Sequence, residues 1–105
     1  MFVVLESPKI KAGYAEGTFT LDCPLKTSDI QWTELVNQPH RDPLVIYTER
    51  YGFYQNHPNA ANFKVDENHT LTISNLARSD TGEYTCRGRE NSLTYEVNLC
   101  GKYHD

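Results

Sequence analysis

Apolar and polar residues alternate with a period of two in several short stretches of the chain. The alternating stretches span 18–23, 70–74 and 93–99, and a fourth stretch, 44–47, is a continuous apolar run of strand length. A period of two places every second side chain on one face of a β-strand. The pattern therefore predicts short strands with a buried face. The residues that would share such a face are Phe19, Leu21 and Cys23 in the first stretch and Leu71 and Ile73 in the second.

Turn-forming residues separate these stretches. Gly, Pro and Asn occur at 12–17, 37–43 and 56–59, and no window of helical length has a convincing period of 3.6 residues. Short strands separated by such turn-forming residues are typical of an antiparallel sandwich or barrel. A chain of 105 residues has room for one hydrophobic core. We therefore expect a single all-β domain over 1–105, with its core between about 3 and 99.

Composition narrows the class of protein. Hydrophobic residues make up 38% of the chain and charged residues 23%, which is typical of a globular domain and not of a disordered tail. The net charge of −4 disfavours nucleic acid and anionic membranes as partners, because both attract basic surfaces. No run of about 18 apolar residues occurs. We therefore expect membrane attachment only through a segment outside this chain.

The three cysteines, Cys23, Cys86 and Cys100, leave two interpretations open. They are buried thiols of an intracellular protein, or one long-range disulfide and an odd cysteine in a secreted protein. They form no Cys-x-x-Cys pair and no Cys/His cluster with zinc-binding spacing. The triplet Asn68-His69-Thr70 is an N-glycosylation sequon, which favours secretion and predicts a glycan on Asn68.

One constellation of residues is more specific than these patterns. It consists of Cys23, of Trp32 nine residues later, and of a segment that ends at the second cysteine. The members of that segment are Leu71, Ile73, Leu76, Asp80, Gly82, Tyr84 and Cys86. From about 17 to 99, the chain resembles the immunoglobulin superfamily. The resemblance implies an immunoglobulin-like two-sheet antiparallel Greek-key sandwich, either variable-type or of the shorter intermediate type.

The resemblance also assigns roles in the core. It implies a disulfide between Cys23 and Cys86, with Trp32 packed against it. Tyr84 resembles a tyrosine corner, in which the hydroxyl bonds the backbone upstream. No Phe-Gly-x-Gly motif follows Cys86, so the chain looks like an innate receptor or adhesion module rather than an antigen receptor. The resemblance also implies that Asp80 and Gly82 form the tight crossover into the strand that carries Cys86. The other core residues that it implies are Asp80, Leu71 and Ile73.

Signatures of catalysis are missing from the sequence. His40, His57, His69 and His104 lie in predicted loops, at a strand edge or in the tail, without metal-binding spacing. No Gly-rich phosphate loop, Gly-x-Ser-x-Gly turn or zinc motif occurs. We therefore expect no enzyme activity, no metal and no cofactor.

Alternation from the implied core residues predicts which side chains face a partner. Trp32, Val45, Tyr84 and Cys86 are placed in the core, so neighbouring residues on their strands point outward. Polar, apolar, aromatic and arginine side chains together suit a protein interface, and the resemblance implies that this front sheet binds proteins. The predicted outward residues are Gln31, Thr33, Leu35, Leu44, Tyr47, Thr85 and Arg87.

Further residues extend this predicted surface. Tyr51, Phe53 and Tyr54 are interpreted either as aromatic anchors for a partner or as cover for the edge of the sandwich. Asn68 is predicted in a turn at the end of the sandwich opposite a charged hairpin tip. Cys100 follows the last strand and bridges to a second copy, bridges to a stalk, or stays unpaired. The charged tip consists of Arg87, Arg89 and Glu90.

These observations predict an extracellular protein-binding domain of a cell-surface immune-type receptor or adhesion molecule. It would lie on the extracellular side of the plasma membrane or be secreted. The expected partner is a protein ligand or counter-receptor, with a homodimer as a further outcome and nucleic acid disfavoured. The alternative is a structural spacer or soluble decoy domain of a secreted or multi-domain protein.

Overall fold

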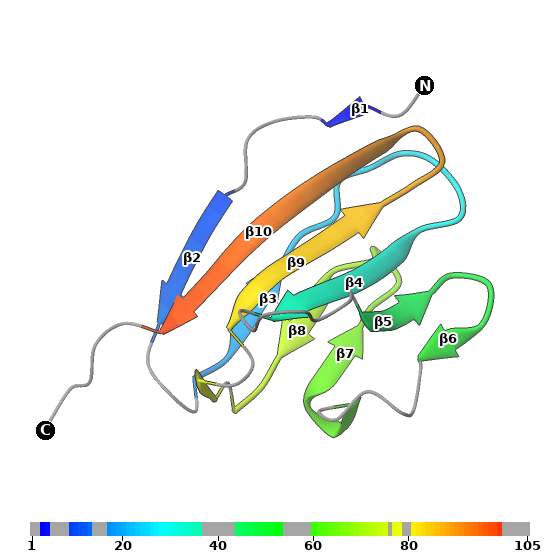
Figure 1. The fold of residues 1–105 in the computed structure, drawn as a ribbon. Coiled ribbons are helices and arrows are strands. Elements are labelled where there is room, and N and C mark those ends of the chain that lie inside the picture. The colour runs from blue at the N-terminus through cyan, green and yellow to red at the C-terminus, as the bar shows by residue number, and fades with distance from the viewer. Residues whose placement is uncertain are drawn as a thin grey trace, which may run out of the picture.

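The chain folds into two facing β-sheets (Figure 1). The structure is a computed structural model that describes residues 3–4, 9–13, 17–36, 44–53, 60–75, 77–78 and 81–99. Apart from the 3-10 helix η1 (Ala60–Asn62), the elements named in this part of the chain are strands. The predicted all-β, two-sheet sandwich is therefore confirmed.

The larger of the two sheets, termed the front sheet, contains seven strands. They are β1 (Val3–Val4), β2 (Lys9–Gly13), β4 (Gln31–Val36), β5 (Leu44–Thr48), β6 (Gly52–Phe53), β9 (Gly82–Arg87) and β10 (Asn91–Leu99). The order is β1-β10-β9-β4-β5-β6, and β2 also pairs with β10. Strands β1 and β2 run parallel to β10, whereas the other pairs are antiparallel. The central strands are therefore paired on both sides.

The smaller back sheet has the order β3-β8-β7. Its strands are β3 (Phe19–Leu21), β7 (Phe63–Val65) and β8 (Leu71–Ile73). Phe19 lies opposite Ile73, and Leu21 lies opposite Leu71. All four side chains are buried, because directly opposed residues share one face of a sheet. The period-two prediction for these strands is confirmed.

A disulfide between Cys23 and Cys86 joins the sheets through the centre of the sandwich. The two Cα atoms are 6.0 Å apart, and the cysteines are separated by 63 residues in sequence. Closing so long a loop stabilises the fold by about 4 kcal/mol in the chain-entropy account. Trp32 is fully buried in the same core cluster, where losing such a side chain costs about 3–5 kcal/mol. The core cysteines and tryptophan thus lie where the resemblance placed them.

Aromatic side chains make further contacts across the core. The rings of Trp32 and Tyr95 are stacked, with their centroids 6.3 Å apart. The ring of Phe63 from the back sheet meets the edge of the Tyr84 ring at the same centroid distance. The Tyr95 hydroxyl donates a hydrogen bond of 2.7 Å to the carbonyl of Asp22, directly after β3. These contacts hold the two sheets in one relative position.

The buried Tyr84 hydroxyl has a side-chain partner that the sequence did not predict. The hydroxyl donates to Oε2 of Glu34 over 2.7 Å. The backbone acceptor upstream that the resemblance implied stays a prediction. Glu34 lies two residues after Trp32 and is only 2% exposed. A carboxylate tolerates such burial when hydrogen bonds satisfy it. A side chain on β4 therefore serves as an acceptor for this tyrosine.

The predicted inward position of Val45 is wrong. Ile46 is the β5 residue buried in the core, at 1% exposure, and Val45 is half-buried opposite Thr33. The cause is a register shift between Trp32 and Thr33 in the pairing of β4 with β5. A β-bulge of this kind interrupts strict alternation. The sequence pattern alone does not reveal it.

Several predicted positions lie outside the described residues. They are Tyr54, Leu76, Asp80 and Cys100, together with His40, His57 and His104. Gly82, the other residue predicted at the crossover, begins β9 with a φ of 150°. The backbone of a residue with a side chain rarely adopts this φ value, so glycine suits the position.

Replacing Tyr84 with Phe should destabilise the fold. The change removes a hydrogen bond to a buried carboxylate, so we expect the free energy of unfolding to fall by about 1–3 kcal/mol. Denaturant titration measures this loss. The matched control, Tyr51→Phe, alters a side chain that is 73% exposed and should change stability by less than about 0.5 kcal/mol. Equal effects of the two substitutions would contradict the proposed role of the Tyr84–Glu34 bond.

Candidate protein-binding face

The outward side chains of β10, β9, β4 and β5 lie in three rows that run across the front sheet. Pairing in register brings the members of each row directly opposite one another, and opposed residues share one face. We call this surface the front face. The first row is Arg87 and Gln31, the second is Thr94, Thr85, Thr33 and Val45, and the third is Glu96, Glu83 and Leu35.

The side chains of the middle row are short and extend only a small distance from the sheet. Thr94, Thr85, Thr33 and Val45 are all β-branched and half-buried. The hydroxyls of Thr85 and Thr94 are hydrogen-bonded over 3.0 Å. Short, stiff side chains lose little conformational freedom on contact, so a partner can approach the sheet closely along this row.

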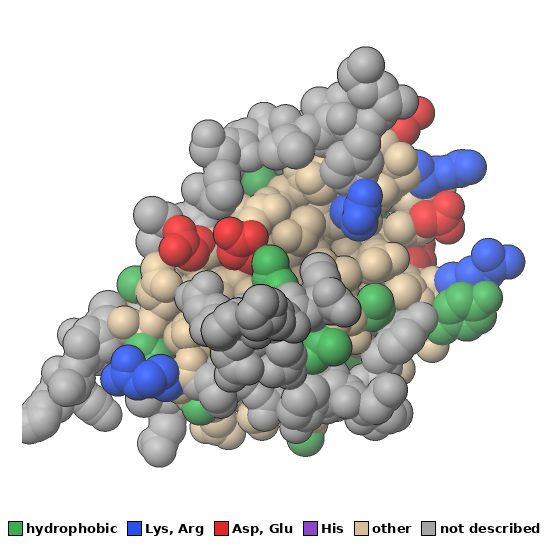
Figure 2. All heavy atoms as spheres, viewed as in Figure 1, with side chains coloured by type: hydrophobic (Ala, Val, Ile, Leu, Met, Phe, Trp, Pro, Cys, Tyr) green, Lys and Arg blue, Asp and Glu red, His purple; other side chains and the backbone are tan. Residues whose placement is uncertain are grey.

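Charge divides the front face into two ends. Arg87 is exposed at the end near the β9–β10 hairpin, whereas Glu83 and Glu96 lie opposite each other near the start of β9. Figure 2 shows two acidic side chains next to each other on this face and a basic side chain nearer the hairpin. Opposed like charges destabilise a strand pair. The sequence interpretation missed both glutamates, although alternation from Tyr84 already places Glu83 outward.

The structure brings the predicted outward residues of β4 and β9 together. Gln31, Thr33, Leu35 and Thr85 are half-buried, as expected for the outer side of a central sheet. Their neighbours along the strands, Trp32, Glu34, Tyr84 and Cys86, are buried. Arg87 is exposed beside them. The predicted face is therefore present over these strands.

The β5 and β6 side of the sheet is more strongly packed. Tyr47 and Phe53 are partly buried against the core, and their rings meet edge to face with centroids 5.4 Å apart. The predicted outward positions of Leu44 and Tyr47 are wrong, because these residues pair with Glu34 and Trp32, whose side chains are buried. Tyr47 and Phe53 therefore cover the edge of the sandwich, while Tyr51 alone of the large hydrophobic residues described is exposed.

Charged and aromatic side chains gather at one end of the sandwich, termed the loop end. The Arg50 guanidinium lies 5.7 Å from the centre of the Tyr51 ring, within cation–π distance. Arg89 Nε lies 3.5 Å from Asp29 Oδ2, but both side chains are largely exposed, so the ion pair contributes little. Glu90, next to Arg89 at the tip of the β9–β10 hairpin, is also exposed. An open hollow of about 250 Å³ lies beside these residues, lined by Ile30, Gln31 and Tyr51 among others.

Two loops of this end pack directly against each other. Gly88 follows β9 and its N–H donates to the carbonyl of Asn91 over 2.9 Å, closing the hairpin. A Cβ on Gly88 would collide with Oγ1 of Thr27 and would approach the Thr27 Cβ to 3.3 Å. The 24–30 segment and the hairpin thus pack so closely that position 88 has room for glycine but not for a side chain.

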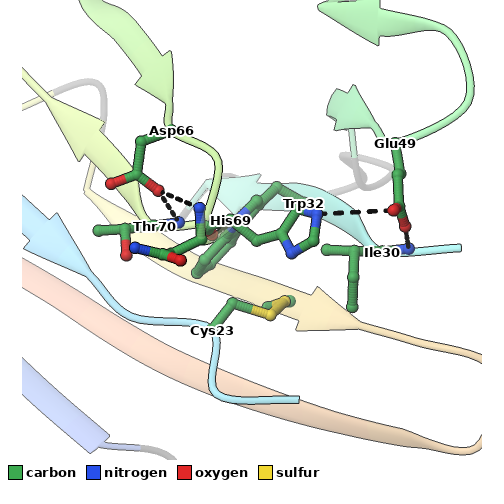
Figure 3. Close-up of polar contacts among 9 residues, drawn as sticks. Cys23, Ile30, Trp32, Glu49, Asp66, His69 and Thr70 are labelled. Atoms are coloured by element: carbon green, nitrogen blue, oxygen red, sulfur yellow. Dashed lines mark hydrogen bonds and ion pairs between the residues drawn. A yellow bond between two sulfur atoms is a disulfide. The ribbon is translucent and has the colours of Figure 1, made fainter. Parts of the chain in front are cut away.

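The turn that carries Asn68 lies at the loop end, which corrects the predicted placement at the opposite end. His69 Nε2 is 3.7 Å from Oε2 of Glu49, directly after β5, and the His69 carbonyl accepts a 2.8 Å bond from Trp32 Nε1. Glu49 Oε1 in turn accepts from the N–H of Ile30 over 3.0 Å (Figure 3). The strand connections, which a linear pattern does not specify, bring these turns together.

Asn68 itself is exposed in this turn. Oδ1 of Asp66 accepts hydrogen bonds from the N–H groups of Asn68, over 2.8 Å, and Thr70, over 3.0 Å. An aspartate that bonds the backbone ahead of it in this way is a common device for closing turns. The backbone of the sequon is therefore held by Asp66, while the Asn68 side chain faces solvent.

No group of three or more His, Cys, Asp and Glu side chains in the described ranges could hold a metal ion. Within the same ranges, no helix has the length and apolar character needed to cross a membrane.

Comparison with known proteins identifies the fold family. The family model for the immunoglobulin V-set domain matches residues 6–99. The chain belongs to the immunoglobulin V-set family. A search of curated proteins finds no match. The V-set assignment agrees with the variable-type expectation and with the presence of β5 and β6 beside β4 in the front sheet.

Membership in the V-set family carries general properties. V-set domains commonly bind protein partners and are generally not enzymes. A V-set domain with a disulfide indicates an extracellular or secreted location, because disulfides persist in oxidising compartments. This supports a protein-binding function in general terms.

Replacing Gly88 with Ala in this V-set domain should force the two packed loops apart. We expect a loss of about 1–3 kcal/mol in the free energy of unfolding, measured by thermal and denaturant unfolding. Thr27→Ala in the same chain should restore most of this loss, because it removes the colliding oxygen. Thr27→Ala alone is the control, since Oγ1 of Thr27 is buried without a hydrogen bond. A Gly88→Ala protein of unchanged stability would contradict the close fit.

Proposed function

We propose that the chain is the extracellular domain of a cell-surface receptor or adhesion molecule, and that it binds a protein partner through the front face. The observation that supports this most directly is the set of three rows on β10, β9, β4 and β5, where apolar, hydroxyl and charged side chains alternate on one surface. Such a mixture is typical of non-obligate protein interfaces. The domain would act by binding and not by catalysis, as V-set domains generally do.

The arrangement of the face favours a modest affinity. Its apolar contribution comes from Leu35 and Val45, both half-buried in the free domain, so contact removes little additional apolar surface from water. Small signalling contacts are often weak for the same reason. A receptor or adhesion molecule compensates by presenting many copies on one surface, which raises the apparent affinity.

A bulky residue in the centre of the front face should block binding. Thr33→Lys places a long side chain in the middle row, whereas Thr72→Lys makes the same change on β8 of the back sheet, where Thr72 is equally half-buried. We expect Thr33→Lys to weaken binding at least about tenfold, which is a loss of about 1.4 kcal/mol, and Thr72→Lys to leave it unchanged.

The measurement uses tetramers of the domain on cells that each display one surface or secreted protein of the source organism. Bound tetramer is quantified by flow cytometry, and circular dichroism shows that each variant is folded. If the unmodified tetramer binds no displayed protein, or if both variants bind equally well, the front-face function is wrong and the spacer alternative is favoured.

We also propose that Asn68 carries an N-linked glycan. Its support is the sequon together with the exposed side chain on a turn whose backbone is held by Asp66. The turn lies behind the front sheet at the loop end, beside Glu49. A glycan at this position would shield that edge and leave the three rows of the front face accessible.

Secretion from a eukaryotic cell should yield a chain with a higher mass than its sequence predicts. Peptide-N-glycosidase should remove the difference, and Thr70→Ala should abolish it because the sequon is lost, whereas Thr70→Ser should retain it. Mass spectrometry of the intact chain measures all three. A secreted unmodified chain with the mass of the bare polypeptide would contradict this assignment.

A further inference from the structure

An open hollow lies at the loop end, beside the first row of the front face. It has a volume of about 250 Å³ and lies between the start of β4 and the turn after β5. Pockets for drug-sized molecules have volumes of about 300–1,000 Å³, so this hollow has room for one ring of a larger ligand. Its lining includes Asp29, Gln31, Thr48, Glu49, Arg50 and Tyr51.

Tyr51 gives this hollow an exposed aromatic ring. Of the large hydrophobic side chains described, it alone is exposed, at 73%. Its N–H donates to Oγ1 of Thr48 over 3.0 Å, and the Arg50 guanidinium lies 5.7 Å from the ring centre. The turn is therefore held by contacts of its own, while most of the ring is accessible. Such a ring adds apolar contact area at low entropic cost when a ligand packs against it.

Charged and polar side chains supply hydrogen-bonding groups around this ring. A carboxylate has about four acceptor sites. His69 and one backbone N–H use part of the Glu49 carboxylate (Figure 3), and Arg89 lies against one oxygen of Asp29. Both carboxylates therefore keep acceptor capacity, and the half-buried Gln31 has the donors and the acceptor of its carboxamide. The lining thus combines donors and acceptors with an aromatic surface.

We propose that the hollow binds one uncharged sugar ring of a glycan carried by a partner molecule. A pyranose has C–H groups on its faces, which pack against an aromatic ring, and hydroxyls around its edge, each of which donates and accepts hydrogen bonds. Tyr51 would cover one face of the sugar. Asp29 and Glu49 would accept from its hydroxyls, and Gln31 would donate to them. This site goes beyond the proposed function, because it does not use the threonine row of the front face.

Charge in the lining favours a neutral sugar over an acidic one. Asp29 and Glu49 carry two negative charges, against the one positive charge of Arg50. Arg89 contacts Asp29 from outside the lining, where an exposed pair contributes little. The carboxylate of an acidic sugar would therefore meet like charges, which disfavours binding.

A titration with single sugars tests the site. The probes are the methyl glycosides of glucose, galactose, mannose, fucose, N-acetylglucosamine and N-acetylneuraminic acid, of which only the last is acidic. They are added at up to about 50 mM, because one ring in an open site binds with a dissociation constant on the order of 1 mM. The chain carries Thr70→Ala, which removes the sequon, so that no glycan of its own can fill the hollow.

Nuclear magnetic resonance of the nitrogen-15-labelled chain measures binding through the shifts of its backbone N–H signals. We expect at least one neutral glycoside to shift the signals of 29–31 and 48–51 in a saturable manner, because these residues line the hollow. The glycoside of N-acetylneuraminic acid should bind at least about tenfold more weakly.

Three substitutions in the same chain test the roles of the lining residues. Tyr51→Ala removes the ring and should weaken binding of the neutral glycoside at least about tenfold, whereas Tyr51→Phe keeps the ring and should leave binding unchanged. Asp29→Asn removes one negative charge and should reduce the discrimination against the acidic glycoside, and asparagine also tolerates the φ of 60° at this position. The matched control, Glu67→Gln, removes an exposed charge on the turn after β7 and should change nothing. Melting temperatures establish that every variant is folded.

The outcomes separate the sugar site from the front-face function. The sugar site is wrong if no neutral glycoside gives saturable shifts, if the shifts lie elsewhere in the chain, or if Tyr51→Ala binds as tightly as the parent chain. Tighter binding of the acidic glycoside would overturn the preference for an uncharged ring. Thr33→Lys, which blocks the front face, should leave sugar binding unchanged. A chain that binds a glycoside but no displayed protein therefore retains the sugar site and loses the front-face function, and the reverse result does the opposite.

Discussion

The disulfide between Cys23 and Cys86 joins the two sheets through the core, and it determines which side of each strand is buried. Because Cys86 faces inward, Thr85 and Arg87, its neighbours on β9, face outward. Strand register places the residues opposite Cys86 on the same buried face, since Trp32 lies opposite Cys86 and is buried with it. A shift of one residue would exchange the two faces. The composition of the front face is therefore a consequence of how the core is linked.

Much of this arrangement could be predicted from the sequence because it depends on local alternation and on a few fixed spacings. The period-two stretches located the buried faces of β3, β8 and β10. The spacing of Cys23, Trp32 and Cys86 indicated the sandwich and the outward positions on β4 and β9. The V-set family match supports the same architecture. Which residues bind a partner does not follow from these patterns, because surface side chains are not constrained by the core.

The features that were missed depend on pairing between distant segments. Ile46 replaces Val45 in the core because a bulge forms only when β5 meets β4. Glu34 has the correct period for burial, and the hydrogen bond that Tyr84, 50 residues later, donates to it helps the core to tolerate its carboxylate. The turn containing Asn68 is placed by the order in which strands connect. None of these relations is visible in a single stretch of sequence.

The close fit between Gly88 and Thr27 also bears on how this domain can vary. Two loops in van der Waals contact do not have independent sequences, because a larger residue in one removes space from the other. Viable substitutions at these positions should therefore be correlated among natural relatives. In a display library, diversifying either loop separately would yield many members with colliding side chains, whereas varying both loops together would sample compatible pairs.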